Sequence, residues 1–325
     1  MHRYAEASVV CGAAVVVVAI AVVLAYVDLP WQSRLWAAVQ DAGHVVAIGS
    51  VAVCLLIAAR RLFPPTPRSI ARHYYSAFAA AAAIGLLVEL AQQWSGRDAE
   101  LGDLVRDVIG AAVFLAFAAL LDPALRGYPR RHWRTVRLAV AGVAMLAFAL
   151  ALGDLALWCA AYVERNQRFP DIVRFDSRWG TRFVSVGRNE LQFVTPPPGW
   201  ESPDGGRVAR LTLRPARYSG FTIDEPYPRW SGYDALVVEL YSEAEQAFAV
   251  TVRVHDAAHD QNYSDRFNAR FTIRPGPNRI RIPLAAIESA PRNRTMNMNA
   301  IAGIVIFTVS PPAPLAVLVR SVSLQ

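Results

Sequence analysis

The chain has 325 residues, enough for two domains, and 54% of them are hydrophobic. Its net charge of +7 comes with 33 basic residues that are all arginine. They are scattered singly or lie in short loops, so we predict no nucleic-acid partner. The three cysteines, Cys11, Cys54 and Cys159, all lie in apolar runs. This excludes a disulfide framework in the polar second half and leaves no Cys/His metal spacing.

Apolar runs dominate the first half of the chain and predict a bundle of transmembrane helices. Residues 8–27 form an uncharged run of 20 residues, which is the length that crosses a bilayer core. We interpret it as a retained helix rather than a cleaved signal peptide, because further apolar runs follow. We therefore predict an α-helical membrane domain over residues 1–164, with five spans at about 8–27, 42–60, 74–93, 104–121 and 138–163.

Two arginine-rich loops predict the orientation of these spans. The loops at residues 60–72 and 126–137 carry most of the basic residues of the first half, and such loops stay in the cytoplasm. The N-terminus is then cytoplasmic, and everything after residue 164 lies outside. We expect a multi-pass protein of the bacterial inner (cytoplasmic) membrane, in contact with membrane lipids.

The sequence period changes after residue 164. Short runs such as FAVTVRVHD and AIAGIVIFTV alternate or stay apolar, and turn signals such as PDGG and RPGPN separate them. Residues 165–325 are thus predicted to form an extracytoplasmic, all-β jelly-roll sandwich. This half resembles jelly-roll domains of the carbohydrate-binding and galactose-binding-like kind. The resemblance rests on Trp230-Ser-Gly-Tyr before a strand and on a long hairpin that contains RxHD and DRFN.

Several polar residues of the predicted spans fall at the same leaflet, although a charge in a bilayer costs roughly 2.5–3.5 kcal/mol. They give either a polar pocket open to the outer leaflet or purely structural ion pairs. Glu89, Asp103, Asp107 and His44 are our catalytic candidates, because paired acids with a histidine serve acid/base chemistry or hold a divalent cation. No other cofactor is expected. The predicted membrane pocket contains His44, Glu89, Gln92, Arg97, Asp103, Asp107 and Gly110.

The order of these residues resembles a known family. Glu89 and Gln92 form E-x-x-Q, Arg97 follows, and Asp103 and Gly110 complete the pattern. This is similar to the VanZ-like membrane protein family over about residues 25–125, with Asp107 where that family usually has asparagine. The resemblance implies a cell-envelope role, with a possible link to glycopeptide-antibiotic resistance.

The β-rich half contains one motif that echoes a zinc site. His255-Asp256-Ala-Ala-His259 resembles HExxH, but the alternating residues before it place it at a strand end rather than on a helix, so we predict no metal there. The alternatives are polar turn residues that anchor a hairpin, or a ligand-facing rim. The ligand-binding candidates are Trp230, His255, Asp256, His259, Tyr263, Asp265, Arg266 and Asn268.

Three functions are compatible with these patterns. The first is a cell-envelope protein whose outer domain recognises a glycan or glycoconjugate. The second is a membrane enzyme that acts on a lipid-linked or cell-wall intermediate. The third is a scaffold whose jelly roll binds a periplasmic protein.

Overall fold

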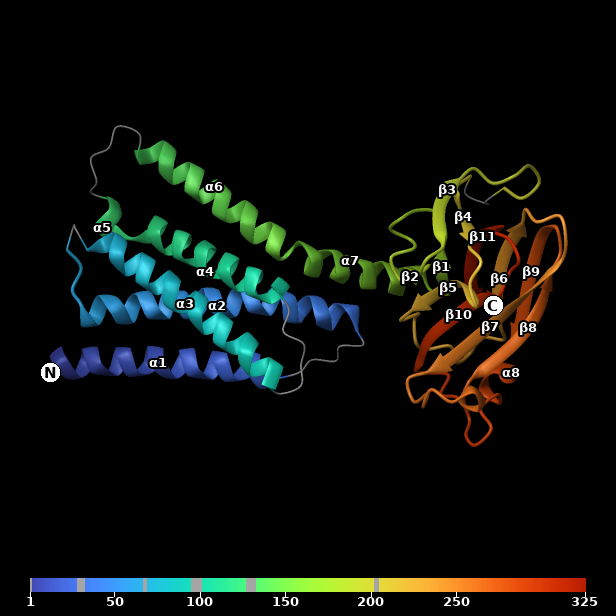
Figure 1. Ribbon diagram of the computed structural model, residues 1–325, viewed down its shortest axis with the longest axis horizontal. Coiled ribbons are helices and arrows are strands. Elements are labelled where there is room, and N and C mark those ends of the chain that lie inside the picture. The colour runs from blue at the N-terminus through green and yellow to red at the C-terminus, as the bar shows by residue number, and fades with distance from the viewer. Residues whose placement is uncertain (1, 28–32, 67–68, 95–100, 127–132, 202–204) are drawn as a thin grey trace. The chain divides into compact units, whose positions relative to one another are not determined.

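The computed structural model describes residues 2–27, 33–66, 69–94, 101–126, 133–201 and 205–325. The chain divides into two compact units, Met1–Cys159 and Ala160–Gln325 (Figure 1). We call them the helical unit and the β unit. The predicted division at residue 164 falls a few residues later than this one, because the end of one helix belongs to the β unit.

The helical unit contains long apolar helices, as predicted. Five helical segments are long and apolar enough to cross a membrane: Ala7–Tyr26, Arg34–Leu62, Ile70–Trp94, Leu101–Leu121 and Arg134–Ala151. The predicted span at 138–163 is divided at Leu152, and its second part is an amphipathic helix that ends with charged residues. The helices are α1 (His2–Tyr26), α2 (Arg34–Leu62), α3 (Ile70–Trp94), α4 (Leu101–Leu121), α5 (Pro123–Arg126), α6 (Trp133–Ala151) and α7 (Gly153–Arg168).

Small residues let two of these helices, α2 and α4, approach closely. A Cβ atom at Gly110 of α4 would lie 2.2 Å from the carbonyl oxygen of Val45 in α2, and one at Gly49 of α2 would lie 2.4 Å from the Phe114 ring of α4. Glycine at such contacts removes the steric barrier between helix backbones. The surrounding core consists of Ile48, Val51, Ala52, Leu56, Ala77, Ala81, Ala111 and Leu115.

The β unit is a sandwich of two antiparallel sheets, which confirms the predicted all-β fold of this half. One sheet has the strand order β3-β4-β11-β6-β9, with β1 beside β11, and the other has the order β2-β5-β10-β7-β8. The strands are β1 (Asp171–Arg174), β2 (Val184–Ser185), β3 (Glu190–Val194), β4 (Val208–Leu213), β5 (Tyr218–Asp224), β6 (Ala235–Ser242), β7 (Phe248–Asp256), β8 (Phe267–Ile273), β9 (Gly276–Pro283), β10 (Ile301–Val309) and β11 (Leu315–Leu324). A short helix, α8 (Leu284–Glu288), and a 3₁₀ turn, η1 (Tyr263–Asp265), lie between strands.

The strand order is that of a jelly roll. Strand β4 pairs with β11, β5 with β10, β6 with β9 and β7 with β8, so the pairs nest as in one long hairpin that has been rolled up. From β4 to β11, consecutive strands therefore alternate between the sheets, except at the central β7–β8 hairpin. This nesting is the arrangement of two Greek keys in a double-sheet jelly roll.

Residue alternation decides which side chains reach the core. Val250, Val252 and Val254 of β7 are buried between the sheets, while the intervening Thr251 and Arg253 are partly exposed on the outer side. Successive side chains of a strand point to opposite faces. The outer side of the β2-β5-β10-β7-β8 sheet therefore presents polar and charged side chains.

Candidate functional site

A groove of about 850 Å³ lies on the outer face of the β2-β5-β10-β7-β8 sheet. We call it the sheet groove. Its floor is set by strand register, because Val305 of β10 lies between Thr222 of β5 and Arg253 of β7, which in turn pairs with Asn268 of β8. The groove is lined by Ser185, Val186, Gly187, Arg188, Asn189, Arg214, Pro215, Ala216, Tyr218, Gly220, Phe221, Thr222, Thr251, Arg253, Tyr263, Arg266, Asn268, Val305, Phe307 and Val309.

Aromatic rings stand at both sides of the sheet groove. Tyr218 is 61% exposed and meets the Phe307 ring edge-to-face, with centroids 5.5 Å apart. On the other side, Tyr263 is 72% exposed, and the guanidinium carbon of Arg266 lies 5.3 Å from its ring centroid. Phe307 can lie close to β5 because its neighbour across the strands is Gly220, which has no side chain. The groove thus offers flat apolar surfaces next to polar groups.

The charge of the sheet groove is positive. Arg188, Arg214, Arg253 and Arg266 line it, and none of its described lining residues is acidic. The Nε atoms of Arg253 and Arg266 are buried and have no hydrogen-bond partner among the described residues. Burial, followed by the nearby charge of Arg266, lowers the pKa of Arg253 from its ordinary value. Two guanidinium groups that repel each other and keep unused N–H donors form a favourable place for an anion.

Two histidines lie beside this arginine pair. The His255 ring packs over Gly303, where a Cβ atom would lie only 2.5 Å from the imidazole. Burial, followed by the charge of Arg253, lowers the pKa of His255 to about 4, so it is neutral near pH 7. His259 accepts a hydrogen bond at Nε2 from Arg253 (3.2 Å) and donates one from Nδ1 to the Asp265 carbonyl oxygen (2.9 Å). His255 therefore adds no positive charge beside the arginines.

The two aspartates among the predicted ligand residues belong to an internal clamp. Arg294 donates to both oxygens of Asp256, at 2.6 and 2.7 Å, and to both oxygens of Asp265, at 2.6 and 2.9 Å. Burial alone would raise the pKa of Asp256, but the hydrogen bonds from Arg294 and from the Asn297 amide lower it overall. The bonds from Arg294 also lower the pKa of Asp265.

The structure separates the predicted rim into three groups. Tyr263, Arg266 and Asn268 line the sheet groove, and His255 and His259 lie next to it. Asp256 is 1% exposed and faces Arg294, so it is not available to a ligand. Trp230 is 0% exposed and donates from Nε1 to the Tyr227 carbonyl oxygen, so it is a core residue rather than a stacking platform. Asp256 thus agrees with the alternative of polar residues that anchor the hairpin. Trp230 is wrong as a ligand-binding candidate, because the sequence does not show which residues cover it.

Sequence reasoning missed the residues that give the groove its character. Tyr218, Phe307 and Arg253 come from three different strands, and Arg294 comes from a loop far along the chain. Each occupies an outward position in an alternating strand or an irregular segment. In the sequence, these residues are recognisable only as aromatic or arginine side chains at outward positions. Such residues are too common to identify which sheet face forms a groove.

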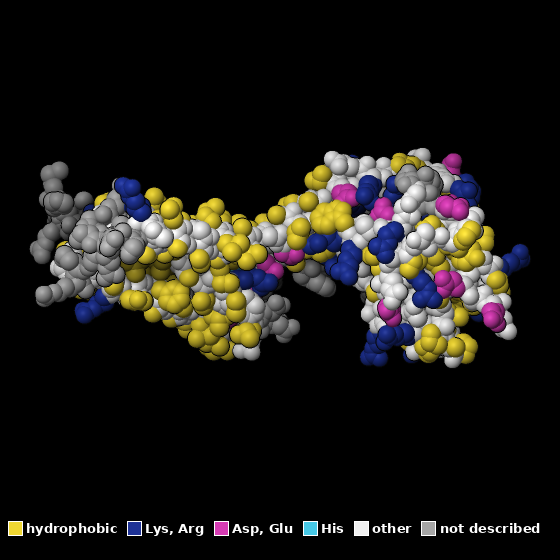
Figure 2. All heavy atoms as spheres, turned by 90° about the horizontal axis from the view of Figure 1, so that it is seen from above, with side chains coloured by type: hydrophobic (Ala, Val, Ile, Leu, Met, Phe, Trp, Pro, Cys, Tyr) yellow, Lys and Arg dark blue, Asp and Glu magenta, His cyan; other side chains and the backbone are white. Residues whose placement is uncertain are grey.

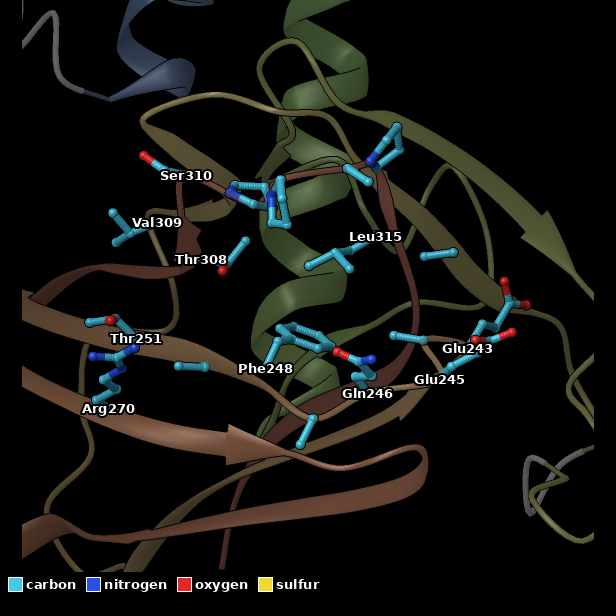
Figure 3. Close-up of a pocket in the computed structure, with 18 of the residues that line it drawn as sticks. Glu243, Glu245, Gln246, Phe248, Thr251, Arg270, Thr308, Val309, Ser310 and Leu315 are labelled. Carbon is cyan, nitrogen blue, oxygen red and sulfur yellow. The ribbon is translucent and has the colours of Figure 1, made fainter.

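A second hollow of about 1000 Å³ lies at one end of the sandwich (Figure 3). Thr251 and Arg270 lie at one side of it, and Glu243 and Glu245 lie at the other. Glu243 also pairs with Arg210, at 2.7 Å. The hollow adjoins the sheet groove, because Thr251 and Val309 line both. Its aromatic lining residue, Phe248, packs against the core, so the hollow lacks the exposed rings of the groove.

The polar residues of the helical unit converge, as their spacing predicts. His44 of α2 contacts two carboxylates of α4, with Nδ1 3.1 Å from Asp107 Oδ1 and Nε2 3.6 Å from Asp103 Oδ2. Glu89 of α3 lies in the same cluster, and one ligand atom from each of His44, Glu89 and Asp107 falls within 4.8 Å of the others. Arg106 joins Asp103 (2.7 Å) to Asp41 (2.8 Å).

The other predicted pocket residues have separate positions. Gln92 is buried and donates to the Leu24 carbonyl oxygen of α1 at 2.9 Å. Gly110 touches the backbone of Val45, so it serves helix contact. Arg97 lies outside the described residues.

A second polar cluster, which the sequence did not reveal, ties the opposite ends of the same helices together. Asp122, just after α4, pairs with Arg60 of α2 and accepts a hydrogen bond from the Tyr74 hydroxyl of α3 at 3.0 Å.

No family model matches the chain, and no curated protein matches it, so the VanZ-like resemblance rests on the motif residues alone. An exo-β-agarase matches with 14% identity and a TM-score of 0.39 over 48% of this chain, which spans only 24% of the agarase.

Two carbohydrate-binding modules also match part of the chain. A family 11 module from Clostridium thermocellum in complex with a β-1,3-1,4-mixed-linked tetrasaccharide has 12% identity and a TM-score of 0.33, over 44% of this chain and 85% of that one. A family 28 module specific for non-crystalline cellulose has 11% identity and a TM-score of 0.33, over 48% and 93%.

Proposed function

We propose that the β unit binds an acidic oligosaccharide in the sheet groove, and that the helical unit anchors it in the bacterial inner membrane with the β unit on the outer side. The observation that carries the proposal is the pairing of exposed aromatic rings with arginines whose buried Nε–H groups have no described partner. Tyr218 and Tyr263 supply the rings, and Arg253 and Arg266 supply the donors.

The chemistry of an acidic sugar chain fits both kinds of surface. The apolar face of a pyranose ring buries its C–H groups against an aromatic ring, which offers a large flat area at low entropic cost. A carboxylate or sulfate on the sugar accepts paired hydrogen bonds from a guanidinium fork. A neutral sugar would leave the repulsion between Arg253 and Arg266 in place, so acidic groups are favoured.

Size and shape also support a chain-like ligand. The volume of about 850 Å³ is in the upper part of the range of small-molecule sites, roughly 300–1,000 Å³. The groove is open on the sheet face and adjoins the hollow at the end of the sandwich. An oligosaccharide of several units can therefore pass across the strands without threading through a closed cavity.

The surface of the helical unit supports membrane anchoring. Large apolar side chains are strongly exposed on it, including Val15 (67%), Leu87 (63%), Leu138 (74%) and Leu150 (72%). Figure 2 shows hydrophobic side chains over much of this unit, whereas charged side chains of both signs are spread over the β unit. Contiguous apolar surface of this kind is favourable only in contact with lipid or protein. The arginines at 60–72 and 126–137 favour a cytoplasmic position for those loops.

The test uses the full-length protein in detergent micelles and isothermal titration with defined oligosaccharides. We expect oligogalacturonate or oligoalginate to bind, and cello- and xylo-oligosaccharides to bind at least about tenfold more weakly. Arg253→Gln should weaken binding of the acidic chains by about tenfold, because a hydrogen bond to a charged group contributes about 1.5 kcal/mol. Tyr218→Ala should weaken acidic and neutral chains alike.

Arg281→Gln is the matched control, because Arg281 is exposed on β9 of the other sheet and does not line the groove. It removes the same charge and should leave affinity unchanged. The proposal fails if no oligosaccharide binds, or if Arg281→Gln weakens binding as much as Arg253→Gln. Preferential binding of single-stranded DNA over every glycan would also overturn it.

A further inference from the structure

The cluster in the helical unit has the donor atoms of a metal site. His44, Glu89 and Asp107 are 1%, 5% and 0% exposed, and each places one ligand atom within 4.8 Å of the others. Bonds of about 2.0–2.2 Å to one ion put two donors at most about 4.4 Å apart. A contraction of a few tenths of an ångström would therefore bring all three donors to a common ion.

One oxygen of the Asp107 carboxylate in this cluster has no described hydrogen-bond partner. Asp107 Oδ1 faces His44 Nδ1 at 3.1 Å, whereas Oδ2 is buried and has no hydrogen-bond partner among the described residues. Oδ2 faces α3, because a Cβ atom at Gly85 would lie 2.6 Å from it. Glu89 lies one turn further along α3 on the same side. A buried carboxylate oxygen without a partner is costly unless something positive meets it.

Acidic groups are concentrated at this level of the helices. The carboxylates of Glu89, Asp103 and Asp107 are all buried, and Asp103 and Asp107 both lie against His44. An imidazole nitrogen together with carboxylate oxygens is a donor set that divalent transition-metal ions bind.

We propose that His44, Glu89 and Asp107 bind one divalent transition-metal ion of the zinc or manganese type between α2, α3 and α4. The nitrogen donor favours these ions over calcium and magnesium, which prefer all-oxygen sites. Asp103, 3.6 Å from the second nitrogen of His44, orients the imidazole, as carboxylates beside metal-bound histidines do. The ion would join three helices whose sequence positions are far apart, so its binding is coupled to the stability of the helical unit.

The described residues contain one other group of potential ligands, His259, Asp260 and Asp265 in the β unit. The potential metal-ligand atoms of Asp265 and His259 already make hydrogen bonds within the protein. Both oxygens of Asp265 accept bonds from Arg294, and both nitrogens of His259 have partners. This group therefore serves as an internal comparison for the buried one.

The test measures metal content and thermal stability of the full-length protein, purified in detergent without a histidine tag. After incubation with Zn²⁺ or Mn²⁺ and removal of excess ion, we expect about one ion per chain by mass spectrometry. Chelation with EDTA should lower the unfolding temperature by several degrees, and the same ion should restore it. Asp107→Asn should abolish both effects, since asparagine keeps the size of the side chain and can still accept the bond from His44.

Asp260→Asn is the matched control, because it makes the same exchange in the other group, at its exposed member Asp260. It should leave the metal content unchanged. Glu89→Gln provides a second removal of a ligand if Asp107→Asn does not fold. The proposal is overturned if the wild-type protein retains no more ion than Asp107→Asn, or if Asp260→Asn rather than the helical variants removes it.

Discussion

Arg294 is the residue on which the turn region beside the sheet groove depends. Its guanidinium binds Asp256 at the end of β7 and Asp265 in η1, so it joins a strand end, a turn and a later loop. The Asp256 side chain is fully buried in this contact. His259 contacts the Asp265 carbonyl oxygen in the same turn, so the clamp lies directly beside the groove residues.

Replacing Arg294 by methionine should destabilise the β unit by about 3 kcal/mol, because it leaves the buried Asp256 charge without its partner. Urea unfolding of the full-length protein, read by hydrogen exchange in peptides from β7 and β8, measures the loss. Arg292→Met is the control, since Arg292 is an exposed neighbour in the same loop. An equal loss in both variants would contradict the clamp.

The same contact gives a pH dependence with a definite sign. Arg294 lowers the pKa values of Asp256 and Asp265 below the ordinary 3.8. The clamp therefore contributes its full stability above about pH 4 and loses it as the pH falls further, when the folded carboxylates are protonated. In Arg294→Met, the decline below pH 4 should be smaller than in the wild type.

The polar residues of the apolar helices could be placed from the sequence, whereas the covered residues of the β unit could not. His44, Glu89, Asp103 and Asp107 were expected at one level of the bundle, because each polar residue could be placed along an apolar helix of known length. They do converge. Asp256 and Trp230 are among the ligand-binding candidates but are buried, because their environments are formed by residues from distant strands and loops.

At the scale of elements, the contact between α2 and α4 positions the buried cluster. Gly110 lies against the Val45 backbone one turn from Asp107, and Val45 follows His44 directly. The distance between the two helices at this level is therefore set by the absence of a side chain at position 110. Glycine was part of the predicted pattern, but its role is close packing rather than lining a pocket.

Gly110→Ala should separate α2 from α4 and destabilise the helical unit by about 1–3 kcal/mol, because the new methyl group would overlap the Val45 carbonyl. Thermal unfolding in detergent measures this. Gly142→Ala is the matched control, because nothing lies within 4 Å of a Cβ atom at that position of α6. Equal stability of the two variants would show that the close contact has no energetic role.

The groove face of the β unit likewise depends on how its strands pair. The alternation in β7 predicts that Thr251, Arg253 and His255 share one side. It does not predict that Val305 and Phe307 of β10 complete that side, because this pairing joins segments separated by two further strands. The sheet groove is thus a product of register across strands.

At the scale of the whole molecule, the main prediction concerns topology. A phosphatase that is active only outside the cytoplasm should be active when fused after residue 165, and inactive when fused after Pro64 in the first arginine-rich loop. Alkaline carbonate washing should leave the full-length protein in the membrane fraction. Activity of the Pro64 fusion alone would reverse the orientation and place the sheet groove in the cytoplasm.

Local sequence patterns are enough to predict the apolar helices, the change to short alternating strands near residue 164 and the level at which the buried polar residues meet. These properties depend on local periodicity and on helix length, which each segment carries alone. The tertiary structure decided the jelly-roll strand order, the division of the last apolar segment at Leu152, and the meeting of Tyr218, Phe307 and Arg253 in one groove. The tertiary structure also decided that Arg294 forms hydrogen-bonded ion pairs with Asp256 and Asp265. Each of these depends on contacts between residues far apart in the chain, for which local patterns contain no information.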